Sequence, residues 1–341
     1  MELSEVRNDD FRENGFMVVE NLLPEDVIET LCQRADAIAA DLDEYLRHNQ
    51  AARDKIEAKH AQTTIRESHS HDVLKAASPA AALARRDSFQ SLPEIRITPR
   101  HARRGDRIYP VRRRVVDPVA RQAALANNDP FNKISQLTHL ADNDDVFRKH
   151  AAHANIIAVL HELLSPNVKL WFDHIFCKAP LNDTPPYGGA NRYHQDGFFQ
   201  FSKRSVTCWI ALEGVTLDNG PFHYIPLSAG YGEFAFDVLD TGITARELEQ
   251  EVVVTLNRGD AVFHDRWTIH ATAPNETSEK RRGWALHYAD AESKWGDHAN
   301  LPGRPSVNFV QTADDEHLRD GKVHGNRYYP LVSGCQFPGC I

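Results

Sequence analysis

Hydrophobic residues recur at two different spacings along the chain, and the first of these is helical. Pro24, Glu25 and Asp26 are typical of a helix start, where proline and acidic side chains are favoured. Apolar residues then return every three or four positions, which predicts one face of a long amphipathic helix made by Val27, Leu31, Ala35, Ile38, Leu42 and Tyr45. This helix is expected to pack against another layer and to carry no chemistry. A second helix is expected from Asp145 to Leu164, ending at Ser165 and Pro166.

From residue 168 onward the spacing shortens to two, which is typical of strands. In the first such segment, Val168, Leu170, Phe172, His174 and Phe176 alternate with Lys169, Trp171, Asp173 and Ile175. Further strands are expected at 205–212, 251–256, 261–264 and 283–290, and turn sequences at 218–221, 257–260 and 273–275 separate several of them. Short strands with such turns favour a β sandwich or barrel over a parallel α/β sheet. The predicted fold class is therefore mainly β with flanking helices.

The composition narrows the class of protein further. The chain has 341 residues, of which 41% are hydrophobic and 26% charged, so most of it is expected to fold. A formal charge of -9 argues against a general nucleic-acid binder, whose affinity depends on lysine and arginine. The N-terminus lacks the pattern of a signal peptide, and no apolar run approaches the roughly 20 residues of a membrane helix. We therefore expect a cytoplasmic protein with neither nucleic acid nor membrane as a partner.

The cysteines form no disulfide framework, since there are five of them and they are widely scattered: Cys32, Cys177, Cys208, Cys335 and Cys340. Free thiols are the favoured interpretation, with a bridge or metal site at the terminal pair as the alternative. From Arg85 to Arg121 the chain holds eleven arginines and only four acidic residues. This segment is either a solvated, irregular insertion or a lid that attracts an anionic substrate. We favour the first interpretation, because charge runs usually lie in solvated segments.

Residues 191–200, NRYHQDGFFQ, contain the first candidate chemistry. In a strand, His194 and Asp196 would point to the same side and Gln195 to the other. With the distant His270 they supply two imidazoles and one carboxylate, a set that suits iron(II) and leaves three positions open. A structural zinc site would close all four positions, usually with cysteine. An ordinary His–Asp hydrogen bond, a zinc or manganese hydrolase on a cupin-like barrel and a metal-stabilised binding protein are the alternatives.

Arg281 follows His270 at the start of the last predicted strand. Alternation places Arg281, Gly283 and Ala285 on one face and Arg282, Trp284 and Leu286 on the other. A guanidinium beside two very small residues leaves space for a carboxylate, which it could bind with two hydrogen bonds. The alternative is that residues 280–282 are a charged loop end in water. His287 shares the face of Arg281, whereas His264 is expected to be a satisfied core histidine.

Several of these segments together carry a family resemblance. The run HQD…TCWIALEGVTLDNGPFHYIP…RGDAVFH…HATAPN…RRGWALHY resembles the phytanoyl-CoA dioxygenase family of iron(II)/2-oxoglutarate oxygenases. The match is good over about 130–290, looser over the opening residues, and absent from about 50–130 and after 300. It implies a double-stranded β-helix (jelly-roll, cupin-like) core at 131–290 in a single oxygenase domain, 1–341. The other parts would be a helical part at 10–65, an arginine-rich insertion at 66–130 and a C-terminal extension at 291–341.

The resemblance also implies roles for seven residues. His194, Asp196 and His270 would be the catalytic iron ligands. Arg281 would pair with the distal carboxylate of 2-oxoglutarate and Thr272 would hydrogen-bond nearby, while Trp209 and Lys178 would line the cosubstrate pocket. For Trp209, simple core packing is the alternative. One loop departs from the family pattern, since Pro226-Leu227-Ser228-Ala229 stands where Pro-Gly-Ser-His is common.

The implied reaction is the oxidation of a small organic molecule. In this family, 2-oxoglutarate and dioxygen give succinate, carbon dioxide and a ferryl intermediate, which abstracts hydrogen from the substrate. Hydroxylation is the favoured outcome, and desaturation and ring closure share the same chemistry. The arginines hint at an anionic substrate, and the aromatic residues Tyr193, Phe198, Phe199 and Phe201 are candidate pocket walls. The sequence predicts neither the substrate nor the oligomeric state.

Overall fold

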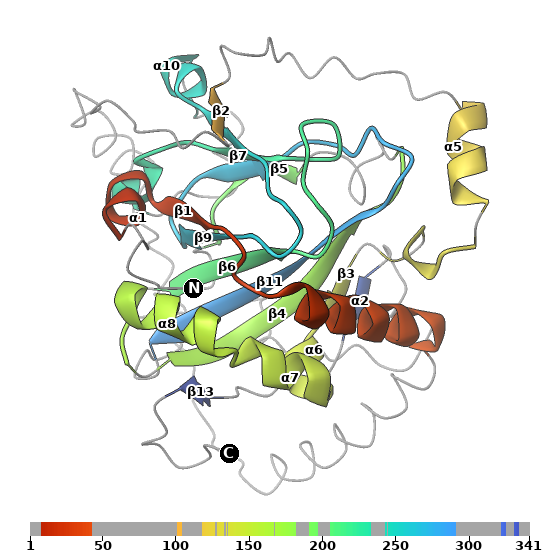
Figure 1. Cartoon of the computed structure of the whole chain (residues 1–341). Coiled ribbons are helices and arrows are strands. Elements are labelled where there is room, and N and C mark those ends of the chain that lie inside the picture. The colour runs from red at the N-terminus through yellow and green to blue at the C-terminus, as the bar shows by residue number, and fades with distance from the viewer. Residues whose placement is uncertain are drawn as a thin grey trace, which may run out of the picture.

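Two β-sheets form the centre of the structure (Figure 1). The larger sheet runs in the order β1 (Phe16–Val19), β9 (Ala261–Asp265), β6 (Ser205–Ala211), β11 (Arg281–Asp290), β4 (Val168–Lys178), β3 (Gln136–Thr138) and β12 (Lys322–His324), and β13 (Leu331–Ser333) pairs with β4. The smaller sheet runs in the order β2 (His101–Arg103), β8 (Val252–Val254), β7 (Phe222–Tyr224), β10 (His270–Thr272) and β5 (Asn191–His194). All pairings are antiparallel except that of β12 with β3.

This computed structural model describes residues 8–42, 101–103, 118–126, 128–132, 134, 136–166, 168–181, 191–196, 205–232, 243, 245–290, 322–324 and 331–333. The inner faces of the two sheets pack against each other around Trp209, Phe222, Tyr224 and Val262. The fold is the double-stranded β-helix that the sequence predicts. Among the described residues, no helix has the length and apolar character needed to cross a membrane.

Helices cover the outer face of the larger sheet (Figure 1). They are α2 (Glu25–Ala40), α6 (Leu140–Asn143), α7 (Asp145–Ala151) and α8 (Ala154–Leu163). In α2 the predicted positions Leu31, Ala35 and Ile38 are buried, together with Ile28. Val27 is only half-buried, the helix ends at Ala40, and Tyr45 lies outside the described residues. Shorter helices lie elsewhere: α1 (Asn8–Asn14), α5 (Pro118–Leu125), η3 (Pro130–Asn132), η5 (Ser228–Tyr231) and α10 (Ala245–Glu249).

The second predicted helix is in fact two helices, α7 and α8. At His153 the backbone is extended, with φ -60° and ψ 136°, and its side chain accepts a hydrogen bond from the backbone N–H of Asn155. That capping contact begins a new helix where the periodic pattern predicts continuation. The prediction of one helix from Asp145 to Leu164 is therefore wrong.

The predicted alternation of the first strand is also wrong, because β4 contains a bulge. Phe172 pairs with His287, but Leu170 pairs with Tyr288, so Trp171 is an extra residue. Val168 and Leu170 consequently share the helix-covered core with Ile175. After the bulge, Phe172, His174 and Phe176 lie half-buried on the opposite face of the strand, toward the smaller sheet.

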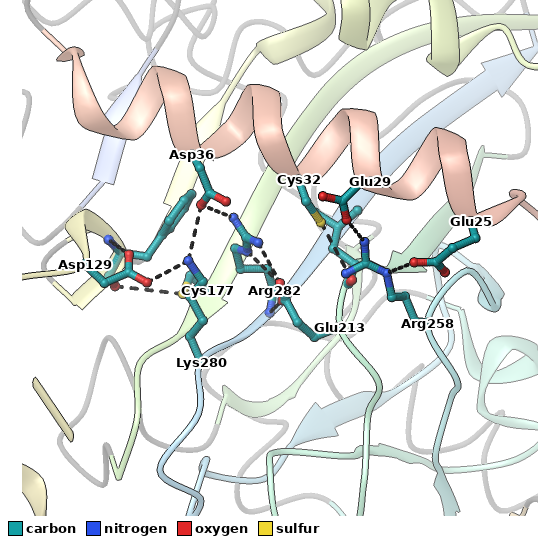
Figure 2. A network of polar contacts seen from close by, with 12 residues as sticks. Glu25, Glu29, Cys32, Asp36, Asp129, Cys177, Glu213, Arg258, Lys280 and Arg282 are labelled. Carbon is teal, nitrogen blue, oxygen red and sulfur yellow. Dashed lines mark hydrogen bonds and ion pairs between the residues drawn. The ribbon is translucent and has the colours of Figure 1, made fainter. Parts of the chain in front are cut away.

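Ion pairs along α2 fix this helix to the ends of the strands below it, as Figure 2 shows. Arg258 contacts Glu25 and Glu29 at 2.8 Å each, and these acidic side chains are exposed. Arg282, in contrast, is 3% exposed and binds Glu213 and Asp36 at 2.6 Å each. Exposed pairs contribute about 0–1 kcal/mol, and Asp36 is itself 49% exposed, so the buried apolar face is the main contact that holds the helix in place.

Segments outside the predicted core also add strands to the sheets. From the predicted helical part, β1 pairs with β9, and from the arginine-rich part, β2 pairs with β8. The C-terminal strands β12 and β13 pair with β3 and β4. The division of the chain at residues 65, 130 and 290 stays a prediction. Most of the arginine-rich segment, and Cys335 and Cys340, lie outside the described residues.

Candidate active site

Two neighbouring strands of the smaller sheet bring the predicted ligand residues together. His194 ends β5 and is paired in register with His270, the first residue of β10. Asp196 follows β5 directly, and its Oδ1 lies 3.8 Å from His194 Nε2 and 3.9 Å from His270 Nε2. One ligand atom from each residue lies within 4.8 Å of the others, so these three could hold a metal ion. Gln195 points away and donates to the carbonyls of Gly232 and Trp267.

The other carboxylate oxygen of Asp196 faces the larger sheet. Asp196 Oδ2 accepts a hydrogen bond from Thr207 Oγ1 at 2.6 Å and lies 2.8 Å from His264 Nε2. His264 is 1% exposed, and its Nδ1 lies 2.9 Å from the hydroxyl of Tyr224. The sequence interpretation of His264 as a core histidine thus missed its place in the site. The signal was present, since alternation along 261–264 places His264 on the same face as Val262.

Burial and neighbouring charges set the protonation of these groups. Burial alone would raise the pKa of Asp196, but the hydrogen bond from His264 and the charge of His270 hold it well below its usual value. Burial, with His194 and His264 nearby, lowers the pKa of His270 well below 6.5. At neutral pH the site therefore presents an ionised carboxylate and a neutral imidazole, the forms that bind metal ions.

Arg281 lies at the other end of the interior and is 1% exposed. Its guanidinium donates to the backbone carbonyls of Gly220 and, at 3.4 Å, Asn219, and lies 5.1 Å from the centre of the Trp209 ring. Among the described residues, no carboxylate lies within ion-pair distance of it. Burial lowers its pKa to about 10, so it still carries its charge at neutral pH.

The adjacent Arg282 is buried too, but its guanidinium pairs with acidic side chains. It points to the helix side, where the Glu213 carboxylate accepts from its Nε at 3.0 Å, its Nη2 at 2.6 Å and its backbone N–H at 2.6 Å (Figure 2). Lys280 binds Asp36 and Asp129 at 3.2 and 2.7 Å. Residues 280–282 are therefore no charged loop end in water. Arg281 is the one of the three whose described contacts include no acid.

Lys178 stands directly opposite Arg281 in β4 and is fully buried. Burial, and then the charge of Arg281, lowers the pKa of Lys178 well below 10.5. Like charges directly opposite each other in neighbouring strands are destabilising.

The turn before β7 is shaped to fit this pair of basic residues. Gly220 has a φ of +98°, and a Cβ there would lie 2.6 Å from Lys178 Cδ and 2.8 Å from the carbonyl oxygen of Ala273. A side chain at this position would be strained and would clash. Glycine therefore lets the turn bring two carbonyls to Arg281 while Lys178 packs against it.

The space beside Arg281 is filled, contrary to the sequence interpretation. A Cβ on Gly283 would lie 1.7 Å from Cζ2 of Trp209. Gly283 is thus small because the indole ring lies over it, and it leaves no room there for a carboxylate. Trp209 packs in the core between the sheets and also faces the guanidinium. Its place in a cosubstrate pocket stays a prediction.

Thr272 supplies the observation that tests whether the interior fits a ligand. It is 6% exposed, and its hydroxyl has no hydrogen-bond partner among the described residues. A buried hydroxyl left in this way costs about 1–3 kcal/mol, so a bound polar group is expected to meet it. Ring contacts connect this region: Phe222 lies 6.4 Å from His270 and 4.9 Å from Trp209, between ring centres.

Of the four aromatic residues proposed as pocket walls, only Tyr193 lies among the described residues. Tyr193 packs with Ile225, Tyr231 and Ile269, away from the metal-ligand candidates, so it is no wall of this site. Phe198, Phe199 and Phe201 lie outside the described residues. His287 does approach the site, with its Nδ1 at 3.0 Å from Thr207 Oγ1 and its ring 5.4 Å from those of Phe172 and His174.

Comparison with known proteins decides the family. The model of the phytanoyl-CoA dioxygenase (PhyH) family matches residues 11–283. The chain belongs to the phytanoyl-CoA dioxygenase family. This confirms the predicted relationship and makes this family member a 2-oxoglutarate-dependent oxygenase, with iron(II), 2-oxoglutarate and dioxygen as cofactor and cosubstrates.

Individual proteins that the chain is similar to share 30% identity or less with it in the three comparisons below. Methylphosphonate hydroxylase from Gimesia maris is 30% identical over 154 residues, which cover 44% of this chain and 58% of that protein. Phytanoyl-CoA dioxygenase domain-containing protein 1 from Bos taurus is 22% identical over 314 residues, or 88% of this chain and 94% of that protein. The epimerase SnoN, crystallised with Fe3+, alpha ketoglutarate and nogalamycin RO, has a TM-score of 0.53 at 17% identity, covering 95% of this chain and 96% of that one. At that identity the likeness shows the fold.

Proposed function

We propose that this family member is a dioxygenase that hydroxylates a small organic molecule, with iron held by His194, Asp196 and His270. The observation that carries the proposal is the arrangement of two separate groups of side chains in one interior. Three metal-ligand candidates converge within 4.8 Å, and two buried basic residues stand opposite each other beside Trp209. A metal ion with three protein ligands retains three positions for other ligands.

Bound iron supplies the oxygen chemistry, and the chain contributes ligand positions, orientation and exclusion of water. The donor set of two imidazoles and one carboxylate fits iron(II). His270 is held in place by a contact of 3.0 Å between its Nδ1 and the carbonyl oxygen of Thr268, which leaves Nε2 for the metal. His270 is buried, whereas the side chains of His194 and Asp196 are 20% and 13% exposed, so the site is largely but not fully shielded from bulk water.

Arg281, Lys178, Thr272 and Trp209 form the proposed 2-oxoglutarate site. The fork of the guanidinium suits a carboxylate, and Trp209 provides the flat surface on which it lies. The charge of Arg281 lowers the pKa of Lys178, and a bound dicarboxylate would offset this repulsion. The Thr272 hydroxyl would donate the hydrogen bond that it lacks among the described residues.

The substrate is proposed to bind along β4, where Phe172, His174 and Phe176 form a half-buried, largely aromatic surface facing the interior. An anionic substrate is the candidate class that we favour. It is supported by the 30% identity to methylphosphonate hydroxylase over part of both chains, since a phosphonate is an anion. Arg281 and Lys178, which would hold the dicarboxylate cosubstrate, speak against a hydrolase.

Substrate-triggered succinate formation tests this function. The purified protein, given iron(II), 2-oxoglutarate and dioxygen, would be screened with alkylphosphonates, carboxylates and acyl-CoA thioesters. We expect one class to stimulate succinate release, with loss of activity in Asp196→Ala. Hydrolysis of a substrate supported by zinc without 2-oxoglutarate would instead establish a hydrolase. Metal binding without any binding of 2-oxoglutarate would instead indicate a metal-stabilised binding protein.

A further inference from the structure

The two oxygens of Asp196 face opposite sheets. Oδ1 points toward His194 and His270 of the smaller sheet, at 3.8 and 3.9 Å. Oδ2 points to the larger sheet and meets Thr207 and His264 at 2.6 and 2.8 Å. The carboxylate thus bridges the two sheets, and each of its oxygens has a different set of neighbours.

The partners of Oδ2 form one row across three adjacent strands. In the larger sheet, Thr207 of β6 is paired in register with His264 of β9 on one side and with His287 of β11 on the other. Their side chains project to the same face because residues in register share a side of the sheet. Asp196 meets the middle of this row from the opposite sheet.

The direction of each hydrogen bond follows from the acceptor at the centre. An ionised carboxylate can only accept, so Thr207 donates its hydroxyl hydrogen and His264 donates from Nε2. His264 Nδ1 then accepts from the hydroxyl of Tyr224 at 2.9 Å, and Thr207 Oγ1 accepts from His287 Nδ1 at 3.0 Å. The five groups therefore form one chain of hydrogen bonds directed toward Asp196 Oδ2.

Packing restricts the rotation of three side chains in this hydrogen-bonded group, namely Tyr224, His264 and Thr207. The Tyr224 ring stacks on Phe16 with ring centres 4.3 Å apart and on Phe222 at 5.7 Å. His264 and Tyr224 are at most 1% exposed, and Thr207 is 3% exposed. The donors are thus held by packing that is independent of any metal ion.

We propose that Thr207 and His264 are positioning residues that hold the Asp196 carboxylate with Oδ1 toward the metal and Oδ2 turned away from it. This proposal rests on the oxygenase function above. If both carboxylate oxygens bound the metal, only two of six positions would stay open; 2-oxoglutarate occupies two, and dioxygen would have none. With Oδ2 engaged in two hydrogen bonds, a third position stays open. Tyr224 and His287 maintain the direction of the two donors.

The test is metal affinity, measured without turnover. Thr207→Val removes the hydroxyl with little change in shape, His264→Phe removes the donor, and His264→Gln retains an N–H at a similar reach. We expect Thr207→Val and His264→Phe to weaken the binding of iron(II), and of cobalt(II) as a probe, by roughly 10–100-fold, the usual effect of removing such a partner. His264→Gln should recover most of this loss.

Cys208→Ala is the matched control, because Cys208 is the next residue of the same strand and packs in the helix-covered core. It should lower stability without changing metal affinity, and circular dichroism would verify the fold of every variant. Unchanged metal affinity in folded Thr207→Val and His264→Phe would overturn the positioning role while leaving the oxygenase proposal standing. Loss in His264→Gln equal to that in His264→Phe would also overturn it. Failure of the unaltered protein to bind either metal would overturn both.

Discussion

Arg281 and Lys178 stand opposite each other in β11 and β4, and both side chains are buried. Burial lowers the pKa of each, to about 10 for Arg281 and well below 10.5 for Lys178. Two basic groups thus lie next to each other in the interior, as expected of the proposed binding site for the anionic cosubstrate.

Replacing Lys178 by methionine should stabilise the protein without 2-oxoglutarate and weaken cosubstrate binding. The unfolded chain binds a proton at Lys178 up to pH 10.5, but the folded chain loses it at a lower pH. Folding therefore gains stability as the pH rises between these two values, and the advantage of Lys178→Met should shrink over the same range. Thermal unfolding at several pH values measures this. Lys280→Met is the control, since Lys280 pairs with Asp36 and Asp129 and should give no stabilisation.

Binding of 2-oxoglutarate should be accompanied by proton uptake. An anion beside Lys178 raises its lowered pKa, so a proton is taken up at any pH between the free and bound values. Affinity should then fall as the pH rises through that window and be constant below it. Calorimetry in two buffers with different ionisation enthalpies would measure the uptake, and Lys178→Met should abolish it. Proton release on binding would contradict the role of Lys178.

Gly283→Ala should destabilise the protein even when no ligand is present. The added Cβ would lie 1.7 Å from Trp209, so the ring must move, and overpacking of this kind costs about 1–3 kcal/mol. Urea unfolding would measure the loss, and Trp209→Leu in the same chain should restore part of it. If Gly283→Ala instead weakens 2-oxoglutarate binding without any loss of stability, the space above Gly283 belongs to the ligand.

The ion pair between Arg282 and Glu213 should contribute more to the free energy of unfolding than the exposed pair between Arg258 and Glu29. Glu213→Gln leaves the guanidinium of Arg282, which is 3% exposed, with only the half-exposed Asp36 as a charged partner. We expect the free energy of unfolding to fall by about 2–4 kcal/mol. The matched control is Glu29→Gln, because the pair of Glu29 with Arg258 is exposed and should contribute less than about 1 kcal/mol. Equal effects of the two changes in urea unfolding would contradict this ranking.

Local patterns in the sequence predict strands at 205–212, 251–256, 261–264 and 283–290, which the structure has as β6, β8, β9 and β11. They also place His194 and Asp196 on one side, whereas the choice of His270 as the third ligand depends on the family resemblance. The bulge at Trp171 was missed because an inserted residue changes the face of every residue after it, and alternation alone does not mark the insertion. The break at His153 depends on a side-chain cap that the apolar spacing does not report.

Tertiary contacts decide what the sequence leaves open at the site. Arg281 and Arg282 are adjacent and chemically identical, and only the position of Glu213 shows which of them is structurally paired. In the sequence, His264 and Thr207 cannot be distinguished from ordinary strand residues. Only the fold shows that both contact Asp196. The sequence also predicts open space beside Gly283, because it does not show that the indole of Trp209 fills this space.

The most direct test of the account is an anaerobic titration of the iron(II)-loaded protein with 2-oxoglutarate, followed by visible absorption. Chelation of iron by the cosubstrate should give a weak charge-transfer band in the unaltered protein. His270→Ala should give no band, and Arg281→Ala should require on the order of 100-fold more 2-oxoglutarate, as expected when one partner of a buried ion pair is removed. No band in the unaltered protein at saturating 2-oxoglutarate, with iron(II) demonstrably bound, would contradict the central claim.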